Sequence, residues 1–214
     1  SAASAAAAAI ALDRLLGLHL PQPELIRYAS LGEIASAGVA NADNVAPAIL
    51  GGFTIVRSYT PLDVVKLSPP KTLSFCIATP DLELPTRTAR AVLPKEIPLQ
   101  HFVHNVGNAA SLVVGMLKGD LDLIGRSMND IIVEPARASL ISGYTLVKNY
   151  AKEAGAVGVT ISGAGPSMVA VVNPKKVSPK KVAQAMKRGF EEVGVKAEAH
   201  VSKPAVGAKV LEEK

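Results

Sequence analysis

The sequence predicts an α+β protein with two domains, and three observations lead to this fold class. A chain of 214 residues suits one large domain or two small ones. Two helical patterns at the start give way to strand patterns, and a Pro-Pro pair at 69–70 separates these from a segment with its own element order. We therefore expect a first domain over residues 1–70 and a second over residues 71–214.

The first domain is expected to begin with two helices. The alanine-rich start favours a helix throughout, and Pro21 and Pro23 end it. A second helical pattern follows in ELIRYASLGEIASAGVA, and GGFTIVRSY and DVVKL are typical of strands. Two helices and a few strands leave little sheet for the helices to cover, so we expect this domain to be incomplete, with a part missing upstream.

The second domain has a recognisable order of elements. Strands are expected at 72–79, 157–162, 167–172 and 196–202, and helices around 86–93, 99–118, 139–154 and 178–193. With the extra helices set aside, the order is β-α-β-β-α-β, which is the split βαβ or ferredoxin-like arrangement. In this arrangement two helices cover one face of an antiparallel sheet.

Composition and charge limit the classes of partner. With 49% hydrophobic and 19% charged residues, the chain resembles a soluble globular protein rather than a disordered one. The net charge is +5, but only 4% of the residues are aromatic, so few side chains can stack on bases. We expect no nucleic-acid partner and interpret the late basic cluster as the solvated face of a helix: Lys175, Lys176, Lys180, Lys181, Lys187 and Arg188. A phosphorylated substrate or cofactor fits the mild positive balance.

A single cysteine and the apolar start bear on the compartment. Cys76 in LSFCIAT excludes a disulfide framework and is expected to be a small core residue, which favours a reducing, cytoplasmic location. No basic segment precedes the apolar start, and Asp13 and Arg14 interrupt it, so we expect neither a secretory signal nor a membrane partner.

The first helix has the parts of an anion site. Its first turn, Ser1-Ala2-Ala3-Ser4, offers free amide N–H groups, a partial positive charge and hydroxyls. Small side chains allow a polyphosphate to approach the backbone, and a serine hydroxyl is a ligand for the accompanying Mg²⁺. The alternative is a tightly packed core helix with a serine cap.

A second Gly-rich stretch, SGAGPS at 162–167, lies between two expected strands. Gly163 and Gly165 permit positive φ, and Pro166 stiffens the exit, so the turn can present N–H groups to a ligand. An ordinary hairpin turn is the alternative.

Together these segments resemble the GHMP small-molecule kinases. SAASAAAAAIAL resembles the second half of their phosphate loop, GLGSSAAS, and TISGAGPSMVAVV resembles their third motif. Between the two, GEIASAGVANADNVAPAILGGF, PTRTAR and IVEPAR are similar to the homoserine kinase family in particular, and the similarity runs over essentially the whole chain. It implies a first domain like that of ribosomal protein S5, here incomplete, joined to a ferredoxin-like second domain.

The resemblance implies ATP and Mg²⁺ as cofactors. Ser1, Ala2 and Ser4 then border the phosphates, and Ser1 and Glu33 are the expected Mg²⁺ ligands. The alternative for Glu33 is a solvated carboxylate or one that pairs helices.

It also implies an acceptor site for homoserine, which carries an ammonium, a carboxylate and a hydroxyl. Asp43 is expected to bind the ammonium, and the guanidinium groups of Arg90 and Arg137 the carboxylate. Asn44 is the expected catalytic residue, which orients the hydroxyl or a phosphate oxygen. The other expected substrate-binding residues are Asn41, which stands where many relatives carry histidine, Thr86, Gly163 and Gly165. Otherwise Asp43 and Asn44 form a turn, and the arginines form surface ion pairs.

The chain also departs from the family. The Gly-Leu-Gly-Ser of the loop and the earlier N-terminal motif are absent, so we expect an N-terminally truncated kinase with little activity by itself. The expected partners are small-molecule substrates, homoserine and ATP, and a second copy of the chain in a possible homodimer. The alternatives are another GHMP kinase, acting on mevalonate, shikimate or a sugar, and a non-catalytic binding module. His101 with His104 is interpreted as one helix face rather than a zinc site.

Overall fold

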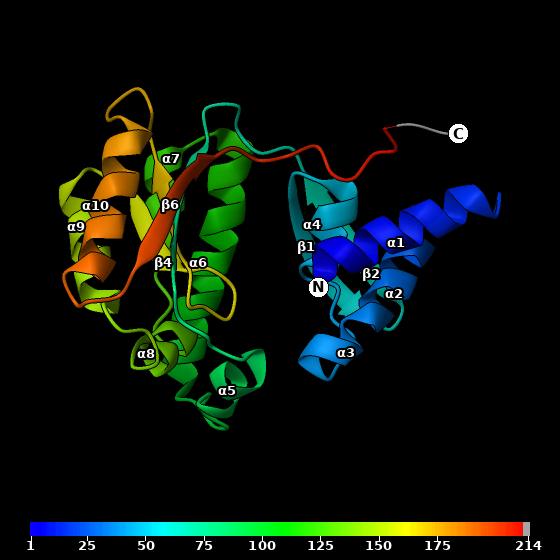
Figure 1. Cartoon of the computed structure of the whole chain (residues 1–214), viewed down its shortest axis with the longest axis horizontal. Helices are drawn as coiled ribbons and strands as arrows, with labels where there is room; N and C mark the ends of the chain where they lie inside the picture. Colours follow the sequence, from blue (N-terminus) through cyan, green and yellow to red (C-terminus); the bar gives the residue numbers. More distant parts are fainter. Residues whose placement is uncertain (212–214) are drawn as a thin grey trace. The chain divides into compact units, whose positions relative to one another are not determined.

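The computed structural model describes residues 1–211, apart from the side chains of residues 36 and 37. The chain folds into two compact units (Figure 1), Ser1–Pro69 with Pro204–Lys214, and Pro70–Lys203, called unit 1 and unit 2 below. The expected second domain included everything after residue 70, whereas the segment that begins at Pro204 packs with unit 1. Residues 212–214 lie outside the described residues.

Unit 1 is mainly helical. Its helices are α1 (Ala2–Leu15), α2 (Gln22–Gly32), α3 (Ile34–Ala37) and α4 (Val45–Leu50), and α1 packs against α2 and α4. Buried Asp13 near the end of α1 accepts a hydrogen bond from the backbone N–H of Leu20 at 2.8 Å, which holds the loop that leads to α2. The core consists of Ala6, Leu25, Ile26, Ala29, Ala42, Val45, Ala46, Ile49 and Leu50.

The sheet of unit 1 is an antiparallel pair, β1 (Phe53–Tyr59) and β2 (Leu62–Leu67). The segment after Pro204 runs beside the start of this pair: Gly52 donates to the carbonyl of Ala205, and Ala208 donates to that of Ala48, both at 2.8 Å. Gly51 makes this passage possible, because it has a φ of +70° and a Cβ there would lie 2.1 Å from the carbonyl carbon of Val206.

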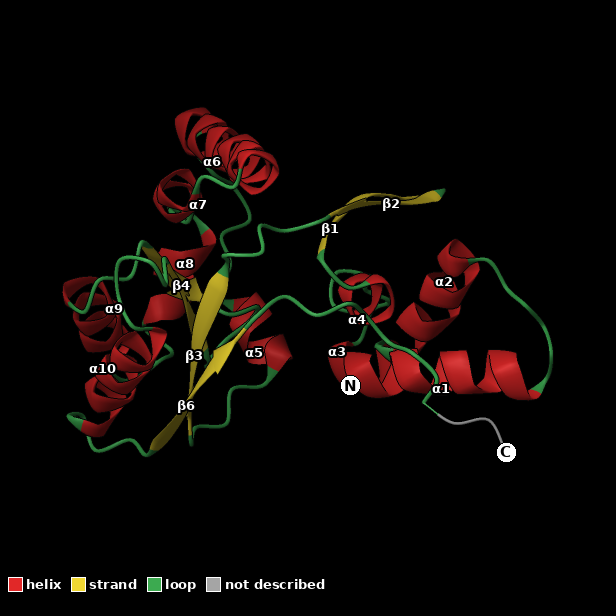
Figure 2. Cartoon of the chain, turned by 90° about the horizontal axis from the view of Figure 1, so that it is seen from above, coloured by secondary structure: helices red, strands yellow, loops and turns green. Residues whose placement is uncertain are grey.

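Unit 2 has the expected ferredoxin-like order. Its antiparallel sheet has the strand order β4-β5-β3-β6, from β3 (Ser74–Pro80), β4 (Gly158–Ile161), β5 (Met168–Val172) and β6 (Ala197–Ser202). Cys76 lies at its centre, paired with Ala170 on one side and Val201 on the other. Figure 2 shows α9 (Tyr144–Glu153) and α10 (Pro179–Glu191) side by side on one face of this sheet. The α+β prediction is confirmed.

The main core of unit 2 lies between the sheet and these two helices. Alternate strand residues such as Ala78 and Met168 meet Val147, Met186 and Phe190 of the helices, all of them fully buried. Cys76 is equally buried, as expected for a core residue, and burial raises the pKa of its thiol to about 11.

Several helices differ from those expected. α6 (Leu99–Lys118) has the predicted bounds and α5 (Thr86–Ala91) is close to them, but α4, α7 (Leu121–Ser127) and α8 (Val133–Ala138) were not predicted. These three are each under two turns long, too short for a hydrophobic period to show. The helix expected over 139–154 begins only at Tyr144, because Gly143 with a φ of +86° interrupts it.

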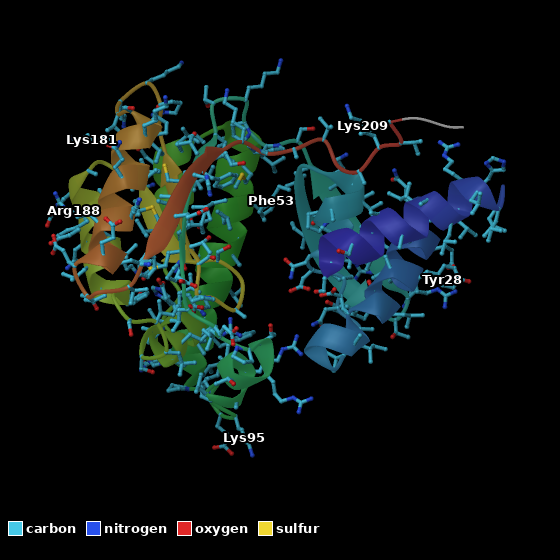
Figure 3. All side chains as sticks on the ribbon, viewed as in Figure 1. Tyr28, Phe53, Lys95, Lys181, Arg188 and Lys209 are labelled. Carbon is cyan, nitrogen blue, oxygen red and sulfur yellow. The ribbon has the colours of Figure 1, made fainter. Side chains whose placement is uncertain are left out.

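The late basic cluster lies on the solvent side of α10 and in the turn before it. All six of its side chains are exposed, and Figure 3 shows Lys181 and Arg188 on the outer side of α10. Lys187 and Arg188 lie 3.5 and 3.6 Å from Glu191 and Glu192, one turn further along. The cluster is therefore a solvated helix face, as predicted. Among the described residues, no helix is both long and apolar enough to cross a bilayer.

Candidate active site

Arg137 joins three segments of unit 2. Its Nε donates to the carbonyl of Ala89 on α5, and its Nη1 donates to the carbonyl of Gly163 in the turn between β4 and β5, both at 3.0 Å. Because a guanidinium has five N–H donors in one plane, these two bonds fix its orientation and use only two of the five. The remaining donors suit a carboxylate.

Arg90 adds a second positive charge at this place. It follows Ala89 in α5, and Thr86 opens the same helix one turn earlier, on the same side. Partial burial and then the nearby charge of Arg90 lower the pKa of the Arg137 guanidinium below its usual value. The carboxylate of Asp130 acts in the opposite direction and raises this pKa in part, so Arg137 interacts with a second cation and with an anion.

The turn at 162–167 contributes differently from the expectation. Its ends pair through the N–H of Ser162 and the carbonyl of Ser167 at 2.8 Å, and the N–H of Gly165 donates back to the carbonyl of Ser162 at 3.0 Å. Gly165 therefore uses its N–H inside the turn, and Gly163 offers a carbonyl to Arg137. Both residues have positive φ, +60° and +84°, as predicted from the glycines.

Asp130 holds the start of α8, the short helix that carries Arg137. Its carboxylate accepts the backbone N–H groups of Ile132, Val133 and Glu134 at 2.8, 2.9 and 3.2 Å, and the side-chain amide of Asn105 on α6 at 2.8 Å. The sequence reasoning missed this residue. An aspartate shortly before IVEPAR is the kind of cap that opens a helix, so the signal was present.

In unit 1, the predicted phosphate residues occupy the start of α1. Ser1 is the N-cap, but its side chain makes no cap hydrogen bond, and Ser1 and Ser4 are exposed while Ala2 is half-buried. Ala6 and Asp13 of this helix are buried, and Ala2, Ala5, Ala9 and Ile10 pack partly buried against the core of unit 1. A helix of 14 residues with small side chains in its first turn fits a phosphate group.

Glu33 lies close to these first turns of α1. It directly follows Gly32, where a Cβ would lie 3.0 Å from the Cβ of Ala5, so the end of α2 touches the second turn of α1. Its side chain is 5% exposed. A solvated carboxylate is therefore excluded. No group of three or more His, Cys, Asp or Glu residues in the described part of the chain is arranged to hold a metal ion. One carboxylate with a hydroxyl and phosphates is nevertheless how Mg²⁺ is commonly bound.

The loop before α4 carries the remaining predicted residues. Asp43 and Asn44 are exposed and Asn41 is half-buried. The Asp43 carboxylate accepts the backbone N–H of Asn44 at 3.1 Å, and Asn44 is the N-cap of α4 without a side-chain cap bond. The amide of Asn44 is therefore not used in capping its own helix. The structure thus brings Arg137, Gly163 and Arg90 together in unit 2, whereas the predicted residues of unit 1 lie on α1, at the end of α2 and in the loop before α4.

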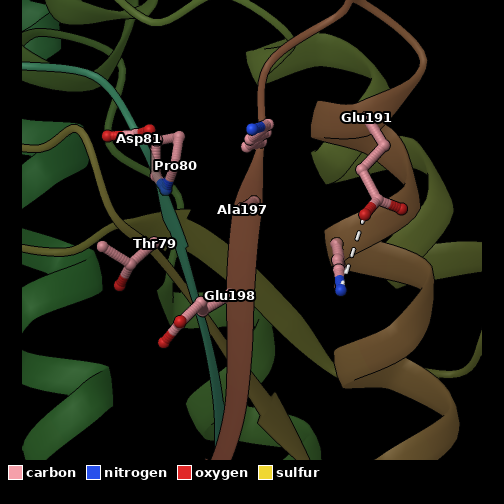
Figure 4. Close-up of a pocket in the computed structure, with 8 residues that line it drawn as sticks. Thr79, Pro80, Asp81, Glu191, Ala197 and Glu198 are labelled. Carbon is pink, nitrogen blue, oxygen red and sulfur yellow. Dashed lines mark ion pairs between the residues drawn. The ribbon is translucent and has the colours of Figure 1, made fainter.

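A separate hollow of about 610 Å³ in unit 2 contains none of the predicted residues (Figure 4). It lies where the ends of β3 and β6 meet α10, and its charged side chains have both signs. The ion pair of Lys187 with Glu191 occupies one wall.

Comparison with known proteins places both units in one superfamily. Residues 1–52 match the GHMP kinases N terminal domain, and residues 112–192 match the GHMP kinases C terminal model. Fold and matches together assign the chain to the GHMP kinase superfamily.

Individual relatives narrow this class. The chain is 50% identical to homoserine kinase of Methanococcus maripaludis over 177 residues, which are 82% of this chain and 57% of the relative. It is 45% identical to homoserine kinase of Chlorobium phaeobacteroides over 214 residues, 99% of this chain and 67% of the relative. The crystal structure of homoserine kinase from Cytophaga hutchinsonii is similar with a TM-score of 0.86 and 45% identity, over 92% of this chain and 62% of that one.

The chain belongs to the homoserine kinase family. It spans 57% to 67% of the length of these three relatives.

Proposed function

We propose that this protein transfers a phosphoryl group from ATP to the hydroxyl of L-homoserine, as a cytoplasmic step of threonine biosynthesis. The observation that carries the proposal is the fixed guanidinium of Arg137, held by Ala89 and Gly163 and placed near Arg90. This arrangement suits the carboxylate of an amino-acid acceptor, and the family membership agrees with it.

On the acceptor side, Arg137 and Arg90 bind the carboxylate of homoserine, and Thr86 hydrogen-bonds beside them. Asp43 pairs with the ammonium group, and Asn44 orients the hydroxyl, with Asn41 at the edge of the pocket. An alcohol that is held by both of its charged groups has lost most of its freedom, which is the main catalytic contribution expected in phosphoryl transfer.

On the donor side, the N-terminus of α1 binds the phosphates through backbone N–H groups, bordered by Ser1, Ala2 and Ser4. Glu33 and the Ser1 hydroxyl are the residues that would hold Mg²⁺, and the fit is supported by the buried carboxylate beside the small residues of α1. ATP supplies the γ-phosphoryl group, and Mg²⁺ neutralises its charge. We also propose that the active form is a homodimer.

The deciding experiment compares acceptors. We would attach to this chain the N-terminal segment of the Cytophaga hutchinsonii relative and call the product the extended form. ADP release would then be measured with homoserine, mevalonate, shikimate and galactose. Homoserine should have the highest kcat/KM, by about 100-fold or more, because none of the other three alcohols carries an ammonium group to pair with Asp43, and galactose also lacks a carboxylate for Arg90 and Arg137.

Two outcomes would contradict the proposal. Preferred turnover of mevalonate, shikimate or galactose would make the protein another kinase of the superfamily. Nucleotide binding by calorimetry without turnover of any of the four alcohols would favour a non-catalytic binding module.

A further inference from the structure

Next to Arg137, helix α8 carries a carboxylate that is almost completely buried. Glu134 is 3% exposed, and its Oε1 accepts hydrogen bonds from the Tyr144 hydroxyl and from Lys148 Nζ, both at 2.8 Å. Lys148 also donates to the Tyr144 oxygen at 3.0 Å, which closes a three-membered network between α8 and α9. We call Glu134, Tyr144 and Lys148 the anchor network.

The anchor network attaches one helix to another at a large cost in desolvation free energy. A carboxylate and an ammonium lose hydration when they are buried, and apolar side chains of similar size often attach two elements equally well. Glu134 Oε2, moreover, is buried without a hydrogen-bond partner in the described part of the chain. Its charge is therefore compensated on one oxygen only, and mainly by Lys148, whose side chain is 20% exposed.

Lys148 nevertheless keeps its positive charge at neutral pH. Burial alone would lower the pKa of Lys148, but the hydrogen bonds to Glu134 and Tyr144 outweigh it and raise the pKa above its usual value. The ammonium therefore stays charged, and the direction of both hydrogen bonds is fixed.

The network lies one turn away from the guanidinium of the proposed site. Residues three apart on a helix are neighbours on its surface, so Glu134 and Arg137 move together when α8 rotates. A six-residue helix is too short to be stable by itself, and its orientation depends on what holds it. Asp130 holds only its first turn. The anchor network is what sets its rotation against α9.

We propose that the anchor network is a positioning device, which sets the rotation of α8 and thereby directs Arg137 to Ala89, Gly163 and the acceptor carboxylate. The part that concerns the acceptor rests on the proposed function. The part that concerns Arg137 and its two carbonyl partners does not.

The test uses two single variants and one double variant. Glu134→Gln and Lys148→Met each remove one charge of the pair. Glu134→Leu with Lys148→Met replaces the pair by apolar side chains, which is expected to recover folding stability if a single variant unfolds. Lys152→Met removes an exposed lysine from the same helix, α9, and serves as the matched control.

The first readout needs no activity. Hydrogen exchange of the Arg137 Nε–H is followed by NMR in the 214-residue chain, because this proton is bonded to the Ala89 carbonyl. We expect exchange about tenfold faster in every folded network variant, including the apolar double variant, and unchanged exchange in the control. If the double variant has the thermal stability and the slow exchange of the unsubstituted chain, the network only attaches α8 to α9, and the positioning role is refuted.

The second readout is kinetic and uses the extended form. The KM for homoserine should rise about tenfold in the network variants, whereas the KM for ATP should stay within about twofold, since misplacement of one acceptor group mainly weakens acceptor binding. Absence of homoserine phosphorylation in the unsubstituted extended form would defeat the proposed function and leave the exchange result standing. Active variants with an unchanged KM for homoserine would overturn the acceptor part of the inference.

Discussion

Each unit positions its own predicted residues in a different way. In unit 2, side chains do this: Arg137 bonds two carbonyl groups from other segments, and Asp130 and Glu134 hold its helix. In unit 1, backbone and small side chains do it, with an alanine-rich helix end beside the Gly32 and Ala5 contact. Unit 2 thus has a pre-oriented guanidinium, whereas unit 1 has an accessible helix end.

This difference agrees with the chemistry of the two proposed ligand groups. A carboxylate is planar and is recognised by donors at a fixed angle, so the guanidinium that binds it has to be held. A polyphosphate carries charge on many oxygens and is bound by a set of backbone N–H groups, for which a helix end and close approach suffice. Substitutions in unit 1 should therefore affect ligand binding when they alter the backbone. In unit 2, the substitution of a single side chain should be enough.

The largest effect is expected from extending unit 1. The extended form should phosphorylate homoserine about 10²–10³-fold faster than the 214-residue chain, because the resemblance of the first helix to the phosphate loop GLGSSAAS predicts that the added segment brings further N–H donors to the phosphates. ADP release measured at equal enzyme concentration checks this. Equal rates for the two forms would show that the phosphates are bound elsewhere.

A smaller effect is expected from one side chain of unit 2. In the extended form, Arg137→Leu should lower kcat/KM for homoserine about 10- to 100-fold, the equivalent of one charge-assisted contact, and leave nucleotide binding unchanged. Arg126→Leu, at an exposed position of α7, is the control. Homoserine kinetics that Arg137→Leu does not alter would remove Arg137 from the site.

Two glycine substitutions in unit 1 should distinguish the effect of close backbone packing on stability from the effect of a positive φ alone. Gly51→Ala should cost about 1–3 kcal/mol more unfolding free energy than Gly17→Ala, since it adds a clash against the segment at Val206 to a positive φ. Gly17→Ala is the matched control, with a φ of +61° but nothing within 4 Å of its Cβ position, and should cost about 1 kcal/mol. Urea unfolding measures both, and equal losses would mean that the close passage of the segment contributes nothing.

How far the sequence predicted these features depends on whether a local pattern carried them. The bounds of α6 and the element order of unit 2 followed from hydrophobic periods, and the positive φ of Gly163 and Gly165 followed from the absence of a Cβ. The bonds from Arg137 to Ala89 and Gly163 join residues 48 and 26 positions apart, and no local pattern encodes such pairs. Arg137 was named through its motif, while its carbonyl partners were not foreseen.

The packing of the segment at Pro204 shows the same limit. No pattern in that stretch indicates that it returns to Gly52 and Ala48, because the return depends on the space left at Gly51. The roles of the predicted site residues, among them Glu33, Asp43 and Asn44, stay predictions.

The smallest effect concerns pH and compares one aspartate from each unit. Burial alone would raise the pKa of Asp130, but hydrogen bonds from Ile132, Asn105, Val133 and Glu134 outweigh it and lower the pKa below its usual value. A carboxyl group with a lowered pKa in the folded state stabilises the fold above its unfolded pKa, about 3.9, and this contribution is lost as the pH falls through the folded value.

Asp130→Ala should therefore lower the free energy of unfolding by about 1 kcal/mol at pH 7, as for the loss of a helix cap, and the difference from the unsubstituted chain should shrink below about pH 4. Asp43→Ala in unit 1 removes an exposed carboxylate with one bond to the next amide and should change stability by less than about 0.5 kcal/mol at either pH. Urea unfolding at pH 7 and pH 3 measures both variants. If Asp130→Ala costs the same at both values, its carboxylate charge does not hold α8, and the side-chain support assigned to unit 2 would have to come from Glu134 and Lys148 alone.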